Sequence, residues 1–226
     1  LRRAFPILLL ALALGAAGAG WYLSTRPQVY DDGGTGEVIY TDEDGTYPFA
    51  GYKQLLNEIY NRVLDSKACS VLDIGFGTGT LSYKLSQHGI KIYGQDFSER
   101  MIEITKSKIP TAELYQGNFA DGLAEELKHN KYDAIIATYS LHHLPDDKKV
   151  SLISELLTLL NDGGAVYIGD VAFETAEARA EARLRVGEEW DDDEFYFAAS
   201  DMQKAFPDIT FERFSFCAGL LCLKKL

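Results

Sequence analysis

A glycine-rich turn in the first half of the chain has the residue types of a site for a small ligand. The apolar residues 71–74 lead directly into Gly75, Gly77 and Gly79, and a helix-length stretch follows. Glycines at such a turn let the backbone approach a ligand closely, and the first residues of a helix present N–H groups that have no partner within the helix. We therefore expect a binding loop between a buried strand and a helix.

The charge beside this turn distinguishes two classes of cofactor. A dinucleotide site typically reads Gly-x-Gly-x-x-Gly, but Thr80 stands where the third glycine would be. Asp73 comes just before the turn, and its carboxylate would repel a pyrophosphate and attract an ammonium group. S-adenosylmethionine carries an ammonium, a carboxylate and a sulfonium but no phosphate, so these residues favour it over NAD.

The motif VLDIGFGTG at residues 71–79 resembles that of the class I S-adenosylmethionine-dependent methyltransferases. The resemblance extends over residues 49–226. It implies an α/β fold with a Rossmann-like, doubly wound sheet of seven strands, mostly parallel, whose last strand is antiparallel and part of a C-terminal hairpin. It also implies S-adenosyl-L-methionine as the cofactor. The residues that the resemblance assigns to cofactor binding are Asp73, Gly75, Phe76, Gly77, Thr78, Gly79, Asp96, Phe97, Asn118, Phe119 and Thr138.

Two polar residues carry the resemblance beyond the glycine turn. Asp96 ends the second apolar run, 23 residues after Asp73, and corresponds to the acidic residue that holds both ribose hydroxyls in the family, since a carboxylate can accept two hydroxyl hydrogens. The alternative for Asp96 is an N-cap of the helix that begins near Ser98. Phe97 would flank the adenine. Asn118 stands where the family usually has an aspartate, and its amide oxygen can still accept from the adenine amine.

Two adjacent histidines, His142 and His143, follow the fourth apolar run, at the sheet edge where ligands bind in such folds. Methyl transfer from a sulfonium is an in-line displacement, so positioning and desolvation can suffice, and a base is needed only where the acceptor must lose a proton. Either histidine is a candidate catalytic base, and the resemblance places Thr138 and Tyr139 in the same cleft. The alternative is that one histidine packs under the loop and bonds a backbone carbonyl. Because neighbouring side chains diverge in an extended segment, we expect no metal site.

The composition bears on the methyl acceptor. The net charge of −12 argues against a surface that tracks nucleic-acid phosphates. Neither a cysteine nor an Asn/Asp-Pro-Pro-Tyr/Phe motif follows the fourth apolar run, which argues against methylation of cytosine C5 or of adenine and glutamine amino groups. We expect a small-molecule acceptor, and not a strongly anionic one if the acidic residues 170–197 face the cleft. Aromatic residues of that stretch would then form an apolar wall: Trp190, Phe195, Tyr196 and Phe197.

Two other functions are compatible with these motifs. A nicotinamide-dependent oxidoreductase is an alternative from a different enzyme class, and both Asp73 and Thr80 argue against it. A non-catalytic module that binds S-adenosylmethionine is another, because methyl transfer requires no nucleophilic side chain that a sequence would reveal. The identity of the cofactor separates the first alternative from a methyltransferase, and turnover of the cofactor separates the second.

The elements that must position these residues alternate along the chain. Short apolar runs alternate with helix-length stretches, which indicates right-handed βαβ units and a mostly parallel sheet. The expected strands are 70–74, 91–95, 112–115, 134–138 and 165–171, and residues 210–216 and 220–223 are expected to form an antiparallel hairpin. The expected helices are 78–87, 99–108, 122–129, 148–161 and 176–186, with a helix stop and turn at 161–164.

The chain divides into three parts. Residues 1–26 contain an uncharged stretch, 4–23, that is long enough to span a bilayer as a helix. This stretch is interpreted either as a signal peptide or as an anchor that would associate the protein with a membrane. Residues 27–46 have the composition of an acidic, glycine-rich linker. We expect residues 47–226 to form the methyltransferase domain.

Two observations predict the compartment. S-adenosylmethionine is made and kept in the cytosol, so we expect a cytoplasmic catalytic domain, either held at a membrane by residues 4–23 or joined to a foreign N-terminal segment. The cysteines lie in or beside apolar runs and have no metal-type spacing, which favours buried core thiols in a reducing compartment. They are Cys69, Cys217 and Cys222.

Overall fold

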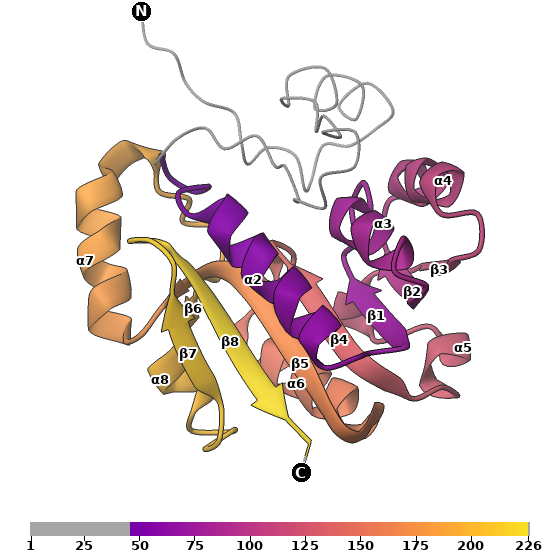
Figure 1. Ribbon diagram of the computed structural model, residues 1–226. Coiled ribbons are helices and arrows are strands. Elements are labelled where there is room, and N and C mark those ends of the chain that lie inside the picture. Colours follow the sequence, from indigo (N-terminus) through magenta and orange to yellow (C-terminus); the bar gives the residue numbers. More distant parts are fainter. Residues whose placement is uncertain (1–45, 226) are drawn as a thin grey trace, which may run out of the picture.

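The alternating apolar runs become the strands of one sheet in residues 46–225, the part of the chain that the computed structural model describes (Figure 1). The strands are β1 (Ser70–Ile74), β2 (Lys91–Asp96), β3 (Glu113–Gln116), β4 (Tyr132–Thr138), β5 (Leu160–Phe173), β6 (Phe197–Ala198), β7 (Thr210–Arg213) and β8 (Ala218–Lys224). The α-helices are α2 (Tyr52–Asp65), α3 (Thr80–Ser86), α4 (Glu99–Lys108), α5 (Glu125–Lys128), α6 (Asp146–Thr158), α7 (Ala176–Val186) and α8 (Ala199–Met202). Three 3-10 turns join them: η1 (Phe119–Asp121), η2 (Leu141–His143) and η3 (Gly187–Glu189).

The strand order creates a point of reversal in the middle of the sheet. The hydrogen-bonded order is β3-β2-β1-β4-β5-β8-β7, and the short β6 pairs beside β5. β1 pairs in parallel with β2 on one side and with β4 on the other, so the chain changes its direction of travel across the sheet there. β8 runs antiparallel to both β5 and β7. The expected mostly parallel sheet with a C-terminal hairpin is confirmed, and β6 adds a short eighth strand. Ligands of open α/β sheets bind at such a reversal, beyond the carboxyl ends of the strands.

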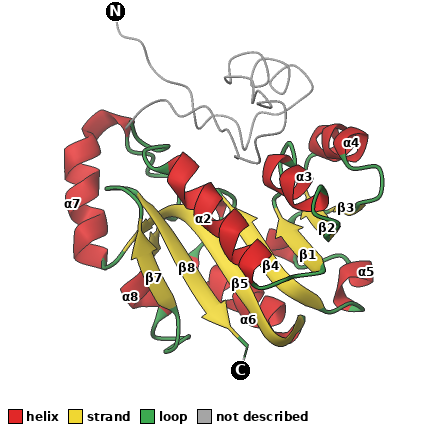
Figure 2. Ribbon diagram, in the orientation of Figure 1, coloured by secondary structure: helices red, strands yellow, loops and turns green. Residues whose placement is uncertain are grey.

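Two apolar clusters lie on opposite faces of this sheet, because successive residues of a strand point to opposite sides. Val71 of β1 belongs to the cluster that α2 and α3 cover, whereas its neighbour Leu72 belongs to the cluster that α6 and α8 cover. On α2, Leu55, Ile59 and Val63 recur at helical spacing and are fully buried. α2, α3 and α4 lie on one face and α5, α6 and α8 on the other (Figure 2). The fold is therefore doubly wound, as expected.

The junction between α6 and β5 differs from the expectation. Residues 161–164 (NDGG) predict a helix stop and a turn, but α6 ends at Thr158 and β5 already begins at Leu160. Gly163 has a left-handed φ of 78°, and its N–H donates to the carbonyl of Lys225 at 3.2 Å. The register between β4 and β5 shifts at this point. The glycines therefore form an irregularity within the strand pair instead of a separate turn.

Three other boundaries also move. α3 begins at Thr80 and not at residue 78, because the turn extends through Gly79, whose φ is 67°. α5 has four residues where the sequence predicts a helix over 122–129. β7 ends at Arg213, so the aromatic residues in 214–216 lie in the turn before β8 and not in the strand.

The cysteines follow the expectation at two of three positions. Cys217 and Cys222 are free and buried, and burial raises the pKa of the Cys217 thiol to about 11. Cys69 is free but exposed, so the expectation of a core thiol is wrong there. It lies just before β1, where its N–H donates to the carboxylate of Asp133 at 2.8 Å and its side chain faces solvent.

The expectations for the N-terminal part fall outside the described residues. These are the signal or anchor at residues 1–26, with its apolar stretch 4–23, and the linker at 27–46, of which the structure describes only residue 46. Within residues 46–225, no helix is both long and apolar enough to cross a membrane.

Candidate functional site

The glycine turn after β1 requires glycine for two different physical reasons. Gly75, Gly77 and Gly79 have φ values of 72°, 54° and 67°, in the left-handed region that favours glycine. A Cβ at Gly79 would lie 2.4 Å from Cγ2 of Thr105, and a Cβ at Gly75 would lie 2.4 Å from Cβ of Ser140. A Cβ at Gly77 would meet no atom within 4 Å. The outer glycines thus allow close packing, and the middle one lies beside open space.

Asp73, at the end of β1, is a buried carboxylate with an incomplete set of hydrogen bonds. It is 2% exposed, and the Ser82 hydroxyl donates to its Oδ2 at 2.6 Å. Its Oδ1 is buried and accepts no hydrogen bond from residues 46–225. Burial raises the pKa of Asp73 to about 7, the nearby Asp96 adds to this, and the Ser82 hydrogen bond opposes it. A buried carboxylate oxygen without a donor is costly, so this site fits a ligand that brings a positive donor.

Asp96, at the end of β2, holds the glycine turn through its carboxylate. Its Oδ2 accepts the N–H of Gly77 at 2.8 Å and its Oδ1 accepts the N–H of Ser98 at 2.9 Å. The N-cap of α4 is Ser98, whose hydroxyl accepts from Met101, so the alternative of Asp96 as the cap is wrong. Burial raises the pKa of Asp96, although these backbone donors oppose it. The adjacent Phe97 is 46% exposed, which leaves a ring face available to a ligand.

The remaining cofactor candidates divide by where their side chains lie. The Asn118 amide oxygen accepts the N–H of Ala120 at 2.9 Å and so caps η1. The Phe119 ring is buried in the core, and the Phe76 ring packs on Gly94, where an added Cβ would lie 2.5 Å from Cδ1 of Phe76. The Phe119 ring also reaches the turn, because a Cβ at Gly75 would lie 3.4 Å from its Cε1. Thr78 is half-buried, and its hydroxyl lies 3.0 Å from that of Thr80.

The end of β4 brings a second group of candidates to the same edge of the sheet. Thr138 is its last residue, and the next residue, Tyr139, has a left-handed φ of 51°. The Ser140 hydroxyl donates to the carbonyl of Ile74 at 2.8 Å and so joins this segment to the glycine turn. The Tyr139 ring packs on that of Tyr52 with centroids 4.9 Å apart. The start of α2 therefore covers the end of β4.

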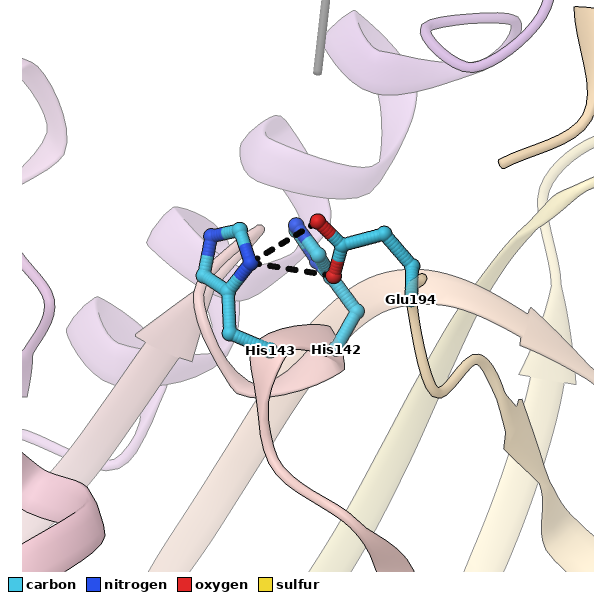
Figure 3. Close-up of side chains that lie close together, drawn as sticks. All are labelled: His142, His143 and Glu194. Atoms are coloured by element: carbon cyan, nitrogen blue, oxygen red, sulfur yellow. Dashed lines mark hydrogen bonds and ion pairs between the residues drawn. The ribbon is translucent and has the colours of Figure 1, made fainter. Parts of the chain in front are cut away.

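His142 and His143 lie side by side on η2 (Figure 3). Nδ1 of His142 is 2.6 Å from Oδ1 of Asp170, and Nδ1 of His143 is 3.0 Å from both carboxylate oxygens of Glu194. The two rings have centroids 4.2 Å apart. The expectation that neighbouring side chains diverge is wrong, because the segment is a 3-10 turn and not an extended strand. The alternative of a histidine bonded to a backbone carbonyl is also wrong, since both partners are carboxylates.

Asp170 fixes the first of these histidines. It is fully buried within β5, three residues before the strand ends at Phe173, and its Oδ2 accepts the N–H groups of Leu141 and His142, each at 3.2 Å. Burial alone would lower the pKa of His142, but the charge and the hydrogen bond of Asp170 outweigh it and raise that pKa. Burial alone would raise the pKa of Asp170, but His142 and the backbone donors lower it. The pair is therefore stabilised as an ion pair.

Asp170 and Glu194 are functional candidates that the sequence interpretation missed. In the sequence, nothing distinguishes these two residues from the other acids of the stretch 170–197 except their positions. In the structure these two carboxylates turn inward, with the Glu194 side chain 5% exposed. The other acidic residues of the stretch are exposed or half-buried: Glu174, Glu177, Glu181, Glu188, Glu189, Asp191, Asp192 and Asp193. A carboxylate within an otherwise apolar strand, as at Asp170, is the signal that could have singled out the first.

The expected aromatic wall forms only in part. Trp190 stacks on Tyr47 with centroids 5.8 Å apart and meets Tyr196 edge-on at 4.8 Å. Phe195 is 46% exposed. Phe197 is fully buried beneath the ammonium group of Lys149, which lies 4.3 Å from its ring centroid, so it belongs to the core and not to the wall.

Comparison with known proteins agrees with this arrangement. A family model described as a methyltransferase domain matches residues 71–164. An uncharacterized methyltransferase from Alkaliphilus oremlandii (strain OhILAs) is 32% identical over 149 residues, which are 66% of this chain and 67% of that protein. The chain spans about two thirds of the length of such curated relatives.

Solved methyltransferase structures share the fold at low sequence identity. Magnesium protoporphyrin IX methyltransferase from Synechocystis PCC 6803 with bound SAH superposes with a TM-score of 0.62 at 20% identity, over 83% of this chain and 91% of that chain. A S-adenosylmethionine-dependent methyltransferase from Clostridium acetobutylicum ATCC 824 gives a TM-score of 0.60 at 14% identity, over 77% and 92%. The family match and the curated relative argue against the oxidoreductase alternative. From its motifs, its strand order and its relatives, the chain belongs to the class I S-adenosylmethionine-dependent methyltransferases.

Proposed function

We propose that residues 47–226 catalyse transfer of a methyl group from S-adenosylmethionine to a small-molecule acceptor by in-line displacement, with S-adenosylhomocysteine as the second product. One observation carries the proposal. The buried Oδ1 of Asp73 has no donor within the described residues, directly beside a glycine turn with open space at Gly77. A ligand that carries both an ammonium and a carboxylate satisfies this carboxylate and the N–H groups of the turn together.

The cofactor side of the site follows from this placement. Asp73 would accept from the ammonium group, and the glycine turn with Thr78 would donate N–H groups to the carboxylate. Asp96 already accepts two backbone N–H groups, but each carboxylate oxygen has a second lone pair for a ribose hydroxyl. Phe97 would flank the adenine with its exposed face, and Asn118 would accept from the adenine amine. When bound, the cofactor supplies an electrophilic methyl group on a sulfonium.

The acceptor side lies at the ends of β4 and β5. Thr138 and Tyr139 would line the transfer cleft, and Tyr139 is held in place by its packing on Tyr52. His142 and His143 would contact the acceptor, with their rings fixed by Asp170 and Glu194. Two inward carboxylates disfavour a strongly anionic acceptor. The stacked Tyr47 and Trp190 favour one with an apolar body.

The test is calorimetric titration of the full chain with S-adenosylmethionine, S-adenosylhomocysteine and NAD. We expect the first two to bind and the Asp96→Asn variant to weaken that binding by about 10–100-fold, because it removes a charged hydrogen-bond acceptor. Glu99→Gln is the matched control, since Glu99 is an exposed acid only three residues away, and it should bind as the unaltered chain does.

Two outcomes would contradict the proposal. Binding of NAD alone would show that the role of Asp73 has been misjudged. Tight binding of S-adenosylmethionine, with no S-adenosylhomocysteine formed across a broad set of hydroxyl, amine and carbon acceptors, would instead favour a non-catalytic module.

A further inference from the structure

Three side chains at the acceptor end of the sheet form a compact set of metal-binding groups. Each of His142, His143 and Glu194 offers one ligand atom, and these atoms all lie within 4.8 Å of one another. Figure 3 shows the two imidazoles and the carboxylate side by side above η2. Two come from η2 and the third from the loop before β6. That loop is pinned to the turn, because the N–H of Phe195 donates to the carbonyl of His142 at 2.8 Å.

The distances between these ligand atoms can be compared with those around a tetrahedrally coordinated ion. Ligands on zinc lie about 2.0–2.2 Å from the metal, so two ligand atoms are about 3.4 Å apart. The Glu194 oxygens lie 3.0 Å from Nδ1 of His143, slightly closer than this separation. All three ligand atoms lie within 4.8 Å of one another, so the longer separations must shorten when one ion binds all three.

Asp170 prepares His142 for metal binding. It occupies Nδ1 of His142 at 2.6 Å, which leaves Nε2 as the nitrogen available to a metal. A carboxylate behind a ligating histidine fixes the ring orientation and raises its basicity, and metal sites commonly contain one. Asp170 is itself held by two backbone N–H groups and cannot swing away.

The local charges leave room for a dication. Asp170 and Glu194 carry two negative charges beside the two imidazoles. One divalent cation balances both carboxylates while the two imidazoles stay neutral. The nearby ammonium of Lys149 is already paired with Asp146 at 3.0 Å and also bonds the carbonyl of Phe195. A site with two nitrogens and one carboxylate suits zinc and other borderline divalent metals, and it keeps a fourth position open.

We propose that Nε2 of His142, Nδ1 of His143 and the Glu194 carboxylate bind one divalent transition-metal ion, with Zn²⁺ as the probe. A water or an acceptor heteroatom would occupy the open position, and an acceptor hydroxyl bound there would lose its proton more readily. That second role rests on the proposed methyl transfer, whereas metal binding itself does not.

The experiment measures metal binding on the full chain in a Cys69→Ser background, which removes the exposed thiol. After chelator treatment and dialysis, Zn²⁺ is titrated against a chromophoric competitor, and we expect one equivalent to bind. His143→Ala and Glu194→Gln should each weaken binding by at least about 100-fold, and Asp170→Asn by about 10–100-fold. His129→Gln, which removes the imidazole at the C-cap of α5 outside this group of ligands, should leave the affinity unchanged.

A second measurement distinguishes loss of the metal site from misfolding of a variant. Co²⁺ should give visible absorption bands of tetrahedral nitrogen and oxygen coordination, and Glu194→Gln should abolish them while calorimetric binding of S-adenosylhomocysteine persists. If Zn²⁺ fails to bind, or binds equally well in Glu194→Gln and His143→Ala, the site is overturned. If the unaltered chain does not bind S-adenosylhomocysteine, the proposed function is contradicted, but the metal-binding result is unaffected.

Discussion

At Asp73 the protein keeps a buried carboxylate with one hydrogen bond where a neutral side chain would cost the fold less. Its pKa of about 7 lies far above the usual range for an aspartate, and burial is the main cause. The unfolded chain releases this proton near pH 4, whereas the folded chain keeps it until about pH 7. The contribution of this group to stability is therefore full at low pH and falls as the pH rises toward 7. A residue that costs stability in this way is typical of a site that meets a charged ligand.

The first prediction concerns Asp73→Asn. The free energy of unfolding of this variant, relative to the unaltered chain, should rise by about 1–3 kcal/mol between pH 5 and pH 8, because the unaltered chain must ionise a buried group in that interval. Urea unfolding at the two pH values measures it. The same change should remove most of the binding of S-adenosylhomocysteine at pH 8.

Asp121→Asn is the control, because Asp121 is an exposed acid and its replacement should leave the pH dependence of stability as it is. A parallel loss of stability by Asp73→Asn at both pH values would show that the carboxylate is a structural group and not a ligand site.

At the scale of elements, the turn between β1 and α3 was the most predictable part of the molecule. Its glycine spacing and the adjacent Asp73 predict both the loop and its ligand from local sequence alone, and Asp96 follows from one βαβ crossover. By contrast, the partners of His142 and His143 lie 28 and 51 residues away along the chain. The position of Asp170 in an apolar strand is a local signal, but no local pattern predicts that Glu194 is the other acid of the stretch that turns inward. The extended conformation expected for the two histidines was wrong for the same reason, since η2 is shaped by its contacts with Asp170.

The boundary between α6 and β5 shows a further limit. An Asn-Asp-Gly-Gly sequence normally predicts a turn, but pairing with β4 extends β5 through it. Tertiary hydrogen bonds outweigh local turn preference at such a position.

The second prediction compares two glycines of the turn. Gly79→Ala should lower the free energy of unfolding by about 2–4 kcal/mol, because it combines left-handed backbone strain with a clash against Thr105. Gly77→Ala should lower it by only about 1–2 kcal/mol, since only the backbone is strained there. Urea denaturation ranks the two.

The order should reverse for ligand binding, because a methyl group at Gly77 points into the space beside the turn. A stability loss at Gly77 as large as that at Gly79 would contradict the open space that the structure shows.

At the scale of the whole molecule, the N-terminal end of the described chain meets the loop after α7 beside His142. The Tyr47 hydroxyl donates to that of Tyr196 at 2.6 Å, and Trp190 stacks on the same Tyr47 ring. The segment before α2 and the loop after α7 therefore depend on each other, although most of the sheet separates them in sequence (Figure 1).

The third prediction tests this dependence. Trp190→Ala should accelerate amide hydrogen exchange in both segments, residues 47–51 and 187–195, and lower stability by about 1–2 kcal/mol through lost aromatic contacts. Trp190→Phe should keep most of the protection of these amides against exchange. Leu184→Ala, at an exposed position on α7, should change the exchange of neither segment. Faster exchange in residues 187–195 alone would show that the two segments move independently.

Because β8 lies between β5 and β7, this side of the sheet can form only after the C-terminal strand has been synthesised. β5 pairs with β4 on one side, but its other edge must stay open until residues 218–224 have left the ribosome, and β7 has no place in the sheet before then. An unpaired edge of this length invites contact with other nascent chains. The β8-pairing edge of β5 therefore has no partner between the synthesis of Phe173 and that of Ala218, and this is the interval in which we expect the nascent chain to be most prone to aggregation.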